Sequence, residues 1–534
     1  MRGKYFYADK TELLYDLIKV ESPCFFSRPR YFGKTLLVDT LEQMLKGNRE
    51  LFKGLWIDGS DYDWKPRPVI NLTFLAIDLD NVKSFRSDLA NRLKIIASHE
   101  NLNLEGSSPP ELFDSLIEQF FKKYNEKIAI LIDEYDTPIL LNLHKPTLSK
   151  EICEYLKSFF SVLKDNDPRR GFTFITGLAT FVRQSIFPAL NDLVDLTMDG
   201  RYASLCGFTS EEFDSLLSDR MEPMLRALKA DGTMSAGKTL SDLRELIHDW
   251  YGGYSWDGKT RVLNPSSILN GFDIALDGDY WPHSGIPLFL ADLVKDGLLK
   301  SRAFQEEISI PQPLIPLELG EKLDPIKLLF QSGFLTLDRL NVTAGNKEWI
   351  LKIPNLQVRA LVISLFLPIN TLARPFLAHK HTKDMVASLI GLDAEAVQRA
   401  FGAFLAEIPA KSHVASAAFY YALFLGAMFF AETKVDANIP EGDWSHDARY
   451  RAPDGTLFVL DIEYCPLRKP KDESDPEKDL EKKMKKAAKA AMKKIDDKNL
   501  TKPYLGSGHD IYKVALIIGG RTNVLVELKK EEQN

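Results

Sequence analysis

A short run of residues near the N-terminus has the types and spacing that bind nucleotide phosphates. Gly33, Lys34 and Thr35 follow the apolar run 24–26, and apolar residues with helical spacing come directly after them. This order predicts a strand, a turn and a helix. In such a turn, backbone N–H groups and the helix N-terminus face the phosphates. We predict that Lys34 contacts the β- and γ-phosphates and that the Thr35 hydroxyl binds Mg²⁺.

The loop before Gly-Lys-Thr departs from the usual phosphate-binding pattern. Arg28 stands where that pattern has a glycine, and Pro29, Arg30 and Phe32 fill most of the remaining positions. Because Gly-Lys-Thr also occurs by chance, a surface turn capped by Thr35 is an alternative. We include the four loop residues among the predicted nucleotide-binding residues.

A second motif supplies the acids that such a site needs. Residues 128–132 form a continuous apolar run, and Asp133 and Glu134 follow it. Such a run is typical of a strand buried on both faces of a parallel sheet, and the carboxyl ends of these strands are where α/β sheets bind ligands. We predict that Asp133 holds Mg²⁺, directly or through water, and that Glu134 polarises the attacking water. A buried strand that ends in a solvated turn is the alternative, but the two motifs together favour an ATPase.

A third apolar run ends in a residue that could complete this site. Thr176 suits a sensor position, where its hydroxyl touches the γ-phosphate or the attacking water, and a strand-end bond to backbone is equally compatible. Arg169 and Arg170 are candidates for an arginine finger toward a neighbouring subunit, with Arg183 a weaker one. A solvated helix end is the alternative for each. A finger in trans would require a homo-oligomer.

Motifs along the first 360 residues resemble those of one family of bacterial proteins. Members of this AAA-ATPase-like family carry a PD-(D/E)XK nuclease-like domain at the C-terminus. The residues that carry the resemblance are Tyr7-Ala8-Asp9-Lys10-Thr11, Arg28-Pro29-Arg30-Tyr31-Phe32-Gly33-Lys34-Thr35, Ile132-Asp133-Glu134-Tyr135-Asp136-Thr137-Pro138, Thr176-Gly177, Tyr251-Gly252-Gly253-Tyr254, Asn264-Pro265, Tyr280-Trp281, Ser332-Gly333-Phe334-Leu335-Thr336 and Ile353-Pro354-Asn355.

The resemblance implies an α/β protein with a P-loop NTPase domain built on a parallel sheet. Arg-Pro-Arg-x-Phe-Gly-Lys is the usual P-loop of this family, so Arg28 is a family trait. The implied cofactors are ATP and Mg²⁺. The implied domains are a P-loop ATPase core (1–204), a helical lid that closes over the nucleotide (205–290), a winged-helix-like and helical connector (291–410) and a nuclease-like domain (411–534).

Within the lid, local signals predict helix starts and a turn. Thr209, with Glu212 three residues later, forms a capping box at the start of a helix. The glycines at 252–253 permit a turn. The aromatic residues around this turn (Trp250, Tyr251, Tyr254 and Trp256) are more typical of a core than of a platform for stacking bases.

Size and composition set limits on the function. A chain of 534 residues is too long for one core, so roughly two to four domains are expected. A hydrophobic content of 45% and a charged content of 27% are ordinary for soluble proteins. The net charge of −7 gives no overall attraction to nucleic acid, so any such binding requires a local patch. The four cysteines lack metal-ligand spacing and indicate reduced thiols in a cytoplasmic protein.

Two segments bear on targeting and membranes. The N-terminus leads into polar sequence without the pattern of a signal peptide. Residues 414–431 are uncharged and rich in aromatic residues, but they only just reach the length of a membrane span. We predict a helix buried in the C-terminal domain and no contact with a membrane.

The C-terminal region presents a second pair of acids. Asp447 and Asp461 lie on two predicted strands joined by the turn 453–455. Two carboxylates on adjacent strands can share a divalent metal that activates water against a phosphodiester. By resemblance to the PD-(D/E)XK core, Asp447 and Asp461 match the metal-binding positions. The position two residues after the second acid is normally lysine, and here it is Glu463.

The following helix, predicted at about 477–495, offers a replacement lysine. Its apolar stripe faces a core, and Lys494 lies at the edge of that stripe. Lys494 could therefore point toward Asp461 and act with Asp447, Asp461 and Glu463 in catalysis, although this family usually has a glutamine near this place. A fully solvated lysine face is one alternative. A face that follows a phosphate backbone of DNA or RNA is another.

Three functions follow from these motifs. The first is an ATPase whose cycle moves a metal-dependent nuclease domain on DNA or RNA. The second is a nucleotide-driven switch whose C-terminal domain only binds nucleic acid or a protein partner. The third, a scaffold with an idle ATP site, is disfavoured because Lys34, Thr35, Asp133 and Glu134 are all present.

Overall fold

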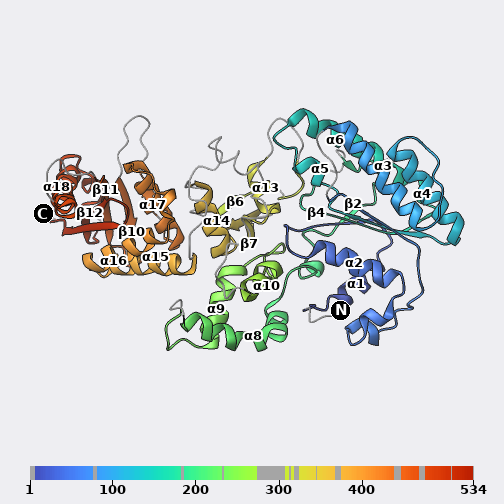
Figure 1. Ribbon diagram of the computed structural model, residues 1–534, viewed down its shortest axis with the longest axis horizontal. Coiled ribbons are helices and arrows are strands. Elements are labelled where there is room, and N and C mark those ends of the chain that lie inside the picture. Colours follow the sequence, from blue (N-terminus) through green and yellow to red (C-terminus); the bar gives the residue numbers. More distant parts are fainter. Residues whose placement is uncertain are drawn as a thin grey trace.

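The computed structural model describes most of the chain, namely residues 6–75, 81–181, 186–230, 234–273, 307–311, 314–317, 324–343, 346–366, 375–433, 435–437, 447–467, 475–506 and 508–532. An N-terminal α/β domain and a C-terminal α/β domain lie at opposite ends of the molecule, and helices and a small sheet lie between them (Figure 1). Arg183, Tyr280 and Trp281 are outside the described residues.

The N-terminal domain contains a five-stranded sheet in the order β2-β3-β4-β1-β5, and all its pairings are parallel. The strands are β1 (Cys24–Ser27), β2 (Val69–Thr73), β3 (Ile128–Asp133), β4 (Arg170–Gly177) and β5 (Val194–Asp195). The helices of this domain are α1 (Thr11–Ile18), α2 (Lys34–Leu45), α3 (Val82–His99), α4 (Pro109–Tyr124), α5 (Thr137–Leu140) and α6 (Pro146–Asp165), and the 3₁₀ turns are Arg49–Phe52, Trp56–Gly59 and Gly200–Tyr202. A parallel sheet of this kind fits the predicted P-loop-type domain.

Helices cover both faces of this sheet, which explains the unbroken apolar run of β3. Ile128, Ile130 and Ile132 belong to the core formed with α3, α4 and α6. Ala129 and Leu131 belong to the core formed with α2 on the other face. Since successive side chains of a strand point to opposite faces, a sheet covered on both sides requires apolar residues at every position.

In the described part of the next region, three helices and a small antiparallel sheet follow. The helices are α8 (Ser210–Ala230), α9 (Leu240–Tyr251) and α10 (Pro265–Asp273). At the start of α8, Thr209 N donates to Glu212 Oε2 (2.8 Å) and Glu212 N donates to Thr209 Oγ1 (3.2 Å), which confirms the predicted capping box. The sheet has the order β6-β8-β7, from β6 (Ile308–Ile310), β7 (Thr336–Thr343) and β8 (Asn346–Lys352), and is flanked by α13 (Pro325–Gln331) and α14 (Leu356–Phe366).

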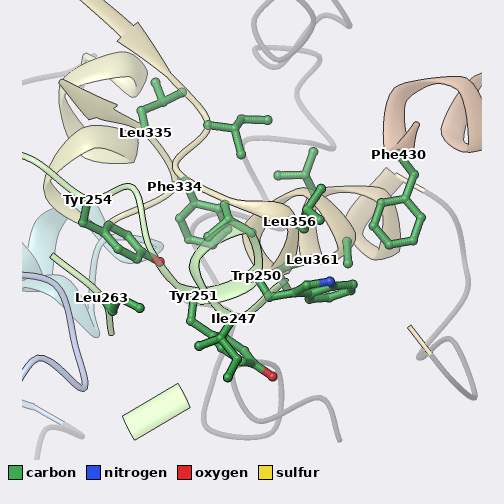
Figure 2. Packing of buried hydrophobic residues seen from close by; sticks show 14 of the residues in the cluster. Ile247, Trp250, Tyr251, Tyr254, Leu263, Phe334, Leu335, Leu356, Leu361 and Phe430 are labelled. Atoms are coloured by element: carbon green, nitrogen blue, oxygen red, sulfur yellow. The ribbon is translucent and has the colours of Figure 1, made fainter. Parts of the chain in front are cut away.

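The aromatic cluster around the turn 252–253 is a core, as predicted. Trp250, Tyr251, Tyr254 and Trp256 are all buried. Figure 2 shows three of these side chains packed among apolar residues from α9, α14 and the segment that begins β7. Buried rings of this kind are not available to stack on nucleic acid bases.

The C-terminal domain contains a second five-stranded sheet, in the order β13-β12-β11-β10-β9. Its strands are β9 (Val435–Ala437), β10 (Asp447–Arg451), β11 (Leu457–Cys465), β12 (Ile511–Gly519) and β13 (Asn523–Lys530). Only the β11–β12 pair is parallel, and α18 (Pro476–Asp497) connects these two strands. The other helices are α15 (Pro375–Ile390), α16 (Ala394–Ala406) and α17 (Ala417–Phe430), with 3₁₀ turns at Ala410–Ser412 and Lys502–Tyr504.

Two segments bear on the extent of the C-terminal domain. The helix α16, expected in the connector, packs on the C-terminal sheet, because Gln398 Oε1 accepts from Val526 N (3.3 Å). This contact favours a domain boundary before α15, and the boundary at residue 411 stays a prediction. Near the C-terminus, Lys529 and Lys530 continue β13, and Lys513 Nζ lies 2.5 Å from Glu531 Oε2.

The apolar segment 414–431 forms α17, a helix of the C-terminal core. Its residues Leu423, Phe424 and Met428 are fully buried or nearly so. Among the described residues, no helix combines the length and the apolar character that crossing a bilayer requires. The prediction of a buried helix is confirmed.

Candidate functional site

The carboxyl ends of three neighbouring strands bring the first set of predicted residues together. Strand β4 lies between β1 and β3, with Phe26 opposite Thr176 and Ile132 opposite Ile175. The P-loop leaves β1, Asp133 ends β3, and Thr176 lies one residue before the end of β4. Because the strands are parallel, their carboxyl ends meet at one edge, where open α/β sheets bind ligands.

Asp133 is the centre of a hydroxyl–carboxylate network. Its Oδ2 accepts from Thr35 Oγ1 (2.8 Å) and its Oδ1 accepts from Thr176 Oγ1 (2.6 Å). Burial raises the pKa of Asp133, and the two hydroxyl donors oppose that rise. Thr35 and Asp133 present hard oxygen ligands at contact distance, which fits a Mg²⁺ ion bound by one carboxylate and one hydroxyl. Thr35 is the second residue of α2 rather than its cap, which is Gly33, so the alternative of a threonine-capped turn is wrong.

The side chain of Lys34 folds back onto the loop that precedes it in the sequence. Its buried ammonium group donates to Arg28 O (2.9 Å) and Pro29 O (3.1 Å), and it lies 3.4 Å from Glu134 Oε1. Gly33 has φ 95°, a left-handed conformation that glycine adopts without strain, and it forms the N-cap of α2.

Glu134 faces Lys34 because of an unusual backbone turn. The residue follows β3 with φ 55°, in the left-handed region that non-glycine residues seldom occupy. Its carboxylate accepts from Thr137 Oγ1 (3.0 Å). Burial raises the pKa of Glu134, but the charge of Lys34 and the hydrogen bond from Thr137 outweigh it, so that the pKa is lowered overall. Glu134 therefore stays ionised, as a group that orients and polarises water must be.

Arg28 makes extensive contacts within the protein around the P-loop. Its guanidinium is buried between the rings of Phe26 (4.2 Å) and Trp256 (4.0 Å). It donates to Ser27 O (2.8 Å), Thr197 O (2.9 Å) and Tyr202 O (3.3 Å), and Arg28 N donates to Gly177 O (3.2 Å). Burial lowers the pKa of the guanidinium to about 9. These hydrogen bonds show that Arg28 supports the loop, and a contact of Arg28 to the nucleotide stays a prediction.

The other loop residues differ in whether they pack within the protein or contact the charged groups of the site. Phe32 is buried and meets Tyr254 and Trp256 edge-on, with ring centroids 4.8 and 5.5 Å apart. It therefore packs the loop against the turn at 252–253, and its contact with the nucleotide stays a prediction. Arg30 is half-buried, and its charge helps to lower the pKa of Glu134. Pro29 contributes the carbonyl that binds Lys34.

The two arginines proposed as fingers are tied to their own end of the sheet. Arg170 is buried and pairs with Asp167, and its Nη1 also donates to Thr173 Oγ1 (3.4 Å). Arg169 Nη1 donates to Asn166 Oδ1 (2.9 Å). Arg170 begins β4 and Arg169 directly precedes it, at the end of the strand opposite to Thr176. Arg170 is thus a structural residue, and a finger in trans from Arg169 stays a prediction.

A second cluster lies on the C-terminal sheet, where Asp447 and Asp461 are direct cross-strand partners. Both side chains are buried. Neither carboxylate oxygen of Asp447 accepts a hydrogen bond from a described residue, and the nearest opposite charge is Arg449 Nη2, 3.3 Å from its Oδ2. Asp461 Oδ2 is also without a hydrogen bond from the described residues. Buried carboxylate oxygens without donors are costly, and a divalent cation would compensate them.

Lys494 reaches this pair from α18. Its ammonium group donates to Asp461 Oδ1 (2.6 Å) and to Glu463 Oε1 (3.2 Å). Burial raises the pKa of Asp461 to about 6, although the hydrogen bond and charge of Lys494 oppose the rise. Within the described part of the chain, no three His, Cys, Asp or Glu side chains gather in a way that could hold a metal. A metal at this place would thus rely on the two aspartates, and water would fill its remaining positions.

Comparison with known proteins identifies the family of the N-terminal domain. Residues 1–187 match the family described as Predicted AAA-ATPase. An uncharacterized protein encoded in the vnfD 5′ region of Azotobacter chroococcum mcd 1 is 32% identical over 406 residues, which cover 76% of this chain and 74% of the relative. The chain belongs to the AAA-ATPase-like family. The matched segment contains the P-loop, Asp133, Glu134 and Thr176, whereas the C-terminal aspartates lie outside it.

The AAA-ATPase-like domain also has a pocket, and apart from Phe32 and Gly33 its lining residues were not singled out as ligands from the sequence. It has a volume of about 110 Å³ and lies beside Gly33 at the start of α2. Its lining is mainly apolar and includes Phe6, Tyr7, Leu36, Phe208 and Pro265. The segment that carries Tyr7 was recognised only as a motif beside the site. The other residues come from α2, the start of α8 and α10, so no local pattern marks them as one surface.

Proposed function

We propose that the protein binds ATP with Mg²⁺ at the P-loop, hydrolyses it, and uses a metal at Asp447 and Asp461 to cleave the phosphodiester backbone of nucleic acid. The observation that carries the first part is the meeting of Lys34, Thr35, Asp133, Glu134 and Thr176 at one sheet edge. Phosphoryl transfer needs positioning and charge stabilisation more than covalent chemistry, and these residues supply both.

Each residue of the ATPase site has a distinct part. Lys34 exchanges its bonds to the loop carbonyls for phosphate oxygens, and Thr35 and Asp133 hold Mg²⁺. Glu134, kept ionised by Lys34, orients the water whose oxygen bonds to the γ-phosphorus as the bond to the β-phosphate oxygen breaks. Thr176 senses the γ-phosphate through its place between Asp133 and Glu134. The apolar pocket beside Gly33 receives the base.

The C-terminal cluster supports the nuclease part of the proposal. Asp447 and Asp461 would hold a divalent metal, which supplies an activated water and stabilises charge on the phosphate. Lys494 takes the place of the missing motif lysine, because its ammonium group lies between Asp461 and Glu463. From that place it can donate to a phosphate oxygen or hold the attacking water.

A second candidate function is a nucleotide-driven switch whose C-terminal domain binds a partner and cleaves nothing. Two observations favour it. Glu463 adds a negative charge where a lysine is usual, and the described residues bring only two carboxylates directly together. In that case the C-terminal site is catalytically inactive, and the positive charge of Lys494 neutralises its carboxylates.

The deciding experiment measures ATP turnover and nuclease activity on single- and double-stranded DNA and RNA with Mg²⁺ or Mn²⁺, with and without ATP. The variants are Asp461→Ala and Lys34→Ala. Cleavage that Asp461→Ala abolishes supports the nuclease, and a loss of its ATP dependence in Lys34→Ala supports control by the ATPase. Intact ATP turnover without cleavage under any condition supports the switch. Absence of both activities rejects the proposal.

A further inference from the structure

The P-loop is joined to the helical segment beside it by aromatic and polar contacts. Phe32 packs against Tyr254 and Trp256, which follow the turn at 252–253. Ser266 Oγ, at the start of α10, donates to Tyr31 O in the loop (3.0 Å). A change in the loop when phosphate displaces Lys34 from its carbonyls would therefore move this turn.

The turn is joined in its own right to the start of α14. Asn355 Nδ2 donates to Gly252 O (2.8 Å), while Asn355 Oδ1 accepts from Val358 N (3.0 Å) and so caps α14. Gly253 has φ 82°, and a side chain there would place its Cβ 2.1 Å from Pro354 O. The turn and the first residues of α14 are thus in direct backbone contact, with no room for one to move without the other.

The side chain of Arg359 joins the helix α14 to the C-terminal end of α17. Arg359 Nη1 donates to Phe429 O (2.9 Å), and its guanidinium lies 4.6 Å from the centre of the Phe429 ring. Beside it, Trp250 of α9 meets Phe430 edge-on with ring centroids 6.1 Å apart, and Figure 2 shows both side chains. Arg359 satisfies a carbonyl at a helix end, where such carbonyls lack partners within the helix.

The N-terminal part of α17 contacts the strand that carries Asp447 of the candidate metal centre. Tyr421, near its N-terminus and buried, donates from its hydroxyl to Asp447 O (2.8 Å). Tyr421 and Phe429 are separated by roughly 12 Å along the helix axis, at about 1.5 Å per residue. A helix packed on a sheet moves as a rigid body over such a length, so a displacement at Phe429 reaches Asp447.

We propose that Arg359 and Tyr421 are positioning residues through which nucleotide binding at the P-loop sets the place of Asp447 relative to Asp461. The inference rests on the proposed function of the P-loop site and names the regulation of the C-terminal site. Each junction along the way is a direct contact between named groups, and the element that moves is α17. By reciprocity, occupancy of the C-terminal site changes the affinity for nucleotide by the same factor.

The test is hydrogen–deuterium exchange of the full chain with and without AMP-PNP and Mg²⁺. It compares the parent protein with Arg359→Met, Tyr421→Phe and a matched control, Tyr420→Phe. Tyr420 neighbours Tyr421 on α17, but its hydroxyl donates to Gly520 O at the far end of β12 (2.9 Å). Exchange is read in three segments, the P-loop, α17 and β10.

We expect nucleotide to protect the P-loop in all four proteins and to change exchange in α17 and β10 of the parent. Arg359→Met loses the change in both α17 and β10, Tyr421→Phe loses it in β10 alone, and Tyr420→Phe keeps both. A protected P-loop with unchanged α17 and β10 in the parent overturns the inference, as does a full response in both Arg359→Met and Tyr421→Phe. If the P-loop of the parent is not protected, the proposed nucleotide site fails and this inference fails with it.

Discussion

The ammonium group of Lys494 lies 2.6 Å from Asp461 Oδ1, although 33 residues separate the two in the chain. The same group lies 3.2 Å from Glu463 Oε1, at the position where the resemblance to the PD-(D/E)XK core predicts a lysine. The helix α18 thus places the positive charge of Lys494 beside the acidic residues of β11. Because of this geometry, the role of Lys494 can be tested by moving the lysine from position 494 to position 463.

Lys494→Ala should remove metal-dependent cleavage, by about 10²- to 10⁴-fold if the lysine moves or holds a proton. The double variant Glu463→Lys, Lys494→Ala should recover part of it, because the new ammonium group arises from β11 beside Asp461. Nuclease assays on both variants check this. The control is Lys489→Ala on the exposed side of α18. Equal cleavage by Lys494→Ala and the parent would contradict the assignment.

Glu134→Gln should bind ATP and fail to turn it over. The amide keeps the shape of the side chain but cannot polarise water, so we expect turnover to fall by about 10²- to 10⁴-fold. Binding by calorimetry and phosphate release by a coupled assay separate the two effects. Glu126→Gln is the matched control, since Glu126 is an exposed partner of Lys65 just before β3. Normal turnover by Glu134→Gln would show that another group orients the water.

Arg28→Met should destabilise the fold by about 2–4 kcal/mol, because it leaves buried carbonyl acceptors without a donor. The acceptors are Ser27 O, Thr197 O and Tyr202 O. Chemical denaturation measures the loss. The control is Arg30→Met in the same loop, where the side chain is only half-buried. If Arg30→Met costs as much as Arg28→Met, Arg28 has no special structural role.

Asp136 should make the stability depend on pH. Its carboxylate is fully buried and accepts from Leu178 N (2.9 Å) and Ala179 N (2.6 Å). Burial, with the charge of Glu134, raises its pKa from 3.8 to about 7. Because the folded-state pKa is raised, its contribution to stability is full below about pH 4 and is lost as the pH rises through about 7.

Asp136→Asn removes this titration while keeping an oxygen that can accept both backbone donors. Between pH 5 and 7 the parent should therefore lose on the order of 2 kcal/mol more stability than the variant does. Urea denaturation across this range makes the comparison. Parallel pH profiles for the two proteins would show that Asp136 is ionised throughout.

The geometry at the carboxyl ends of β1 and β3 could largely be predicted because its motifs are local, whereas nucleotide binding there stays a prediction. Gly33, Lys34 and Thr35 are adjacent in the chain, and an apolar run marks β3 and therefore the place of Asp133. Their roles depend on residue type and on the end of the strand, both of which the sequence contains. The pocket beside Gly33 was missed for the opposite reason, since its walls come from four separate segments that no spacing links.

The placement of the helix α18 could also be predicted from the sequence. The apolar stripe of α18 sets which side faces the sheet, and this placed Lys494 at the edge where Asp461 lies. The register of β10 on β11, which makes Asp447 and Asp461 direct partners, follows from a turn whose length could be read. The assignment of α16 to the C-terminal sheet could not be read, because a helix pattern shows that a face is buried but not what buries it.

The sequence by itself determined which residues could do chemistry and which strands and helices carry them, because residue type and periodicity are local properties. Tertiary structure alone decided what each side chain meets. It turned Arg28 into a buried support between two rings, and it connected Phe32 to Asp447 through α14 and α17. The physical reason is that burial, hydrogen-bond partners and pKa shifts depend on segments far apart in the chain, which only the folded arrangement brings within contact distance.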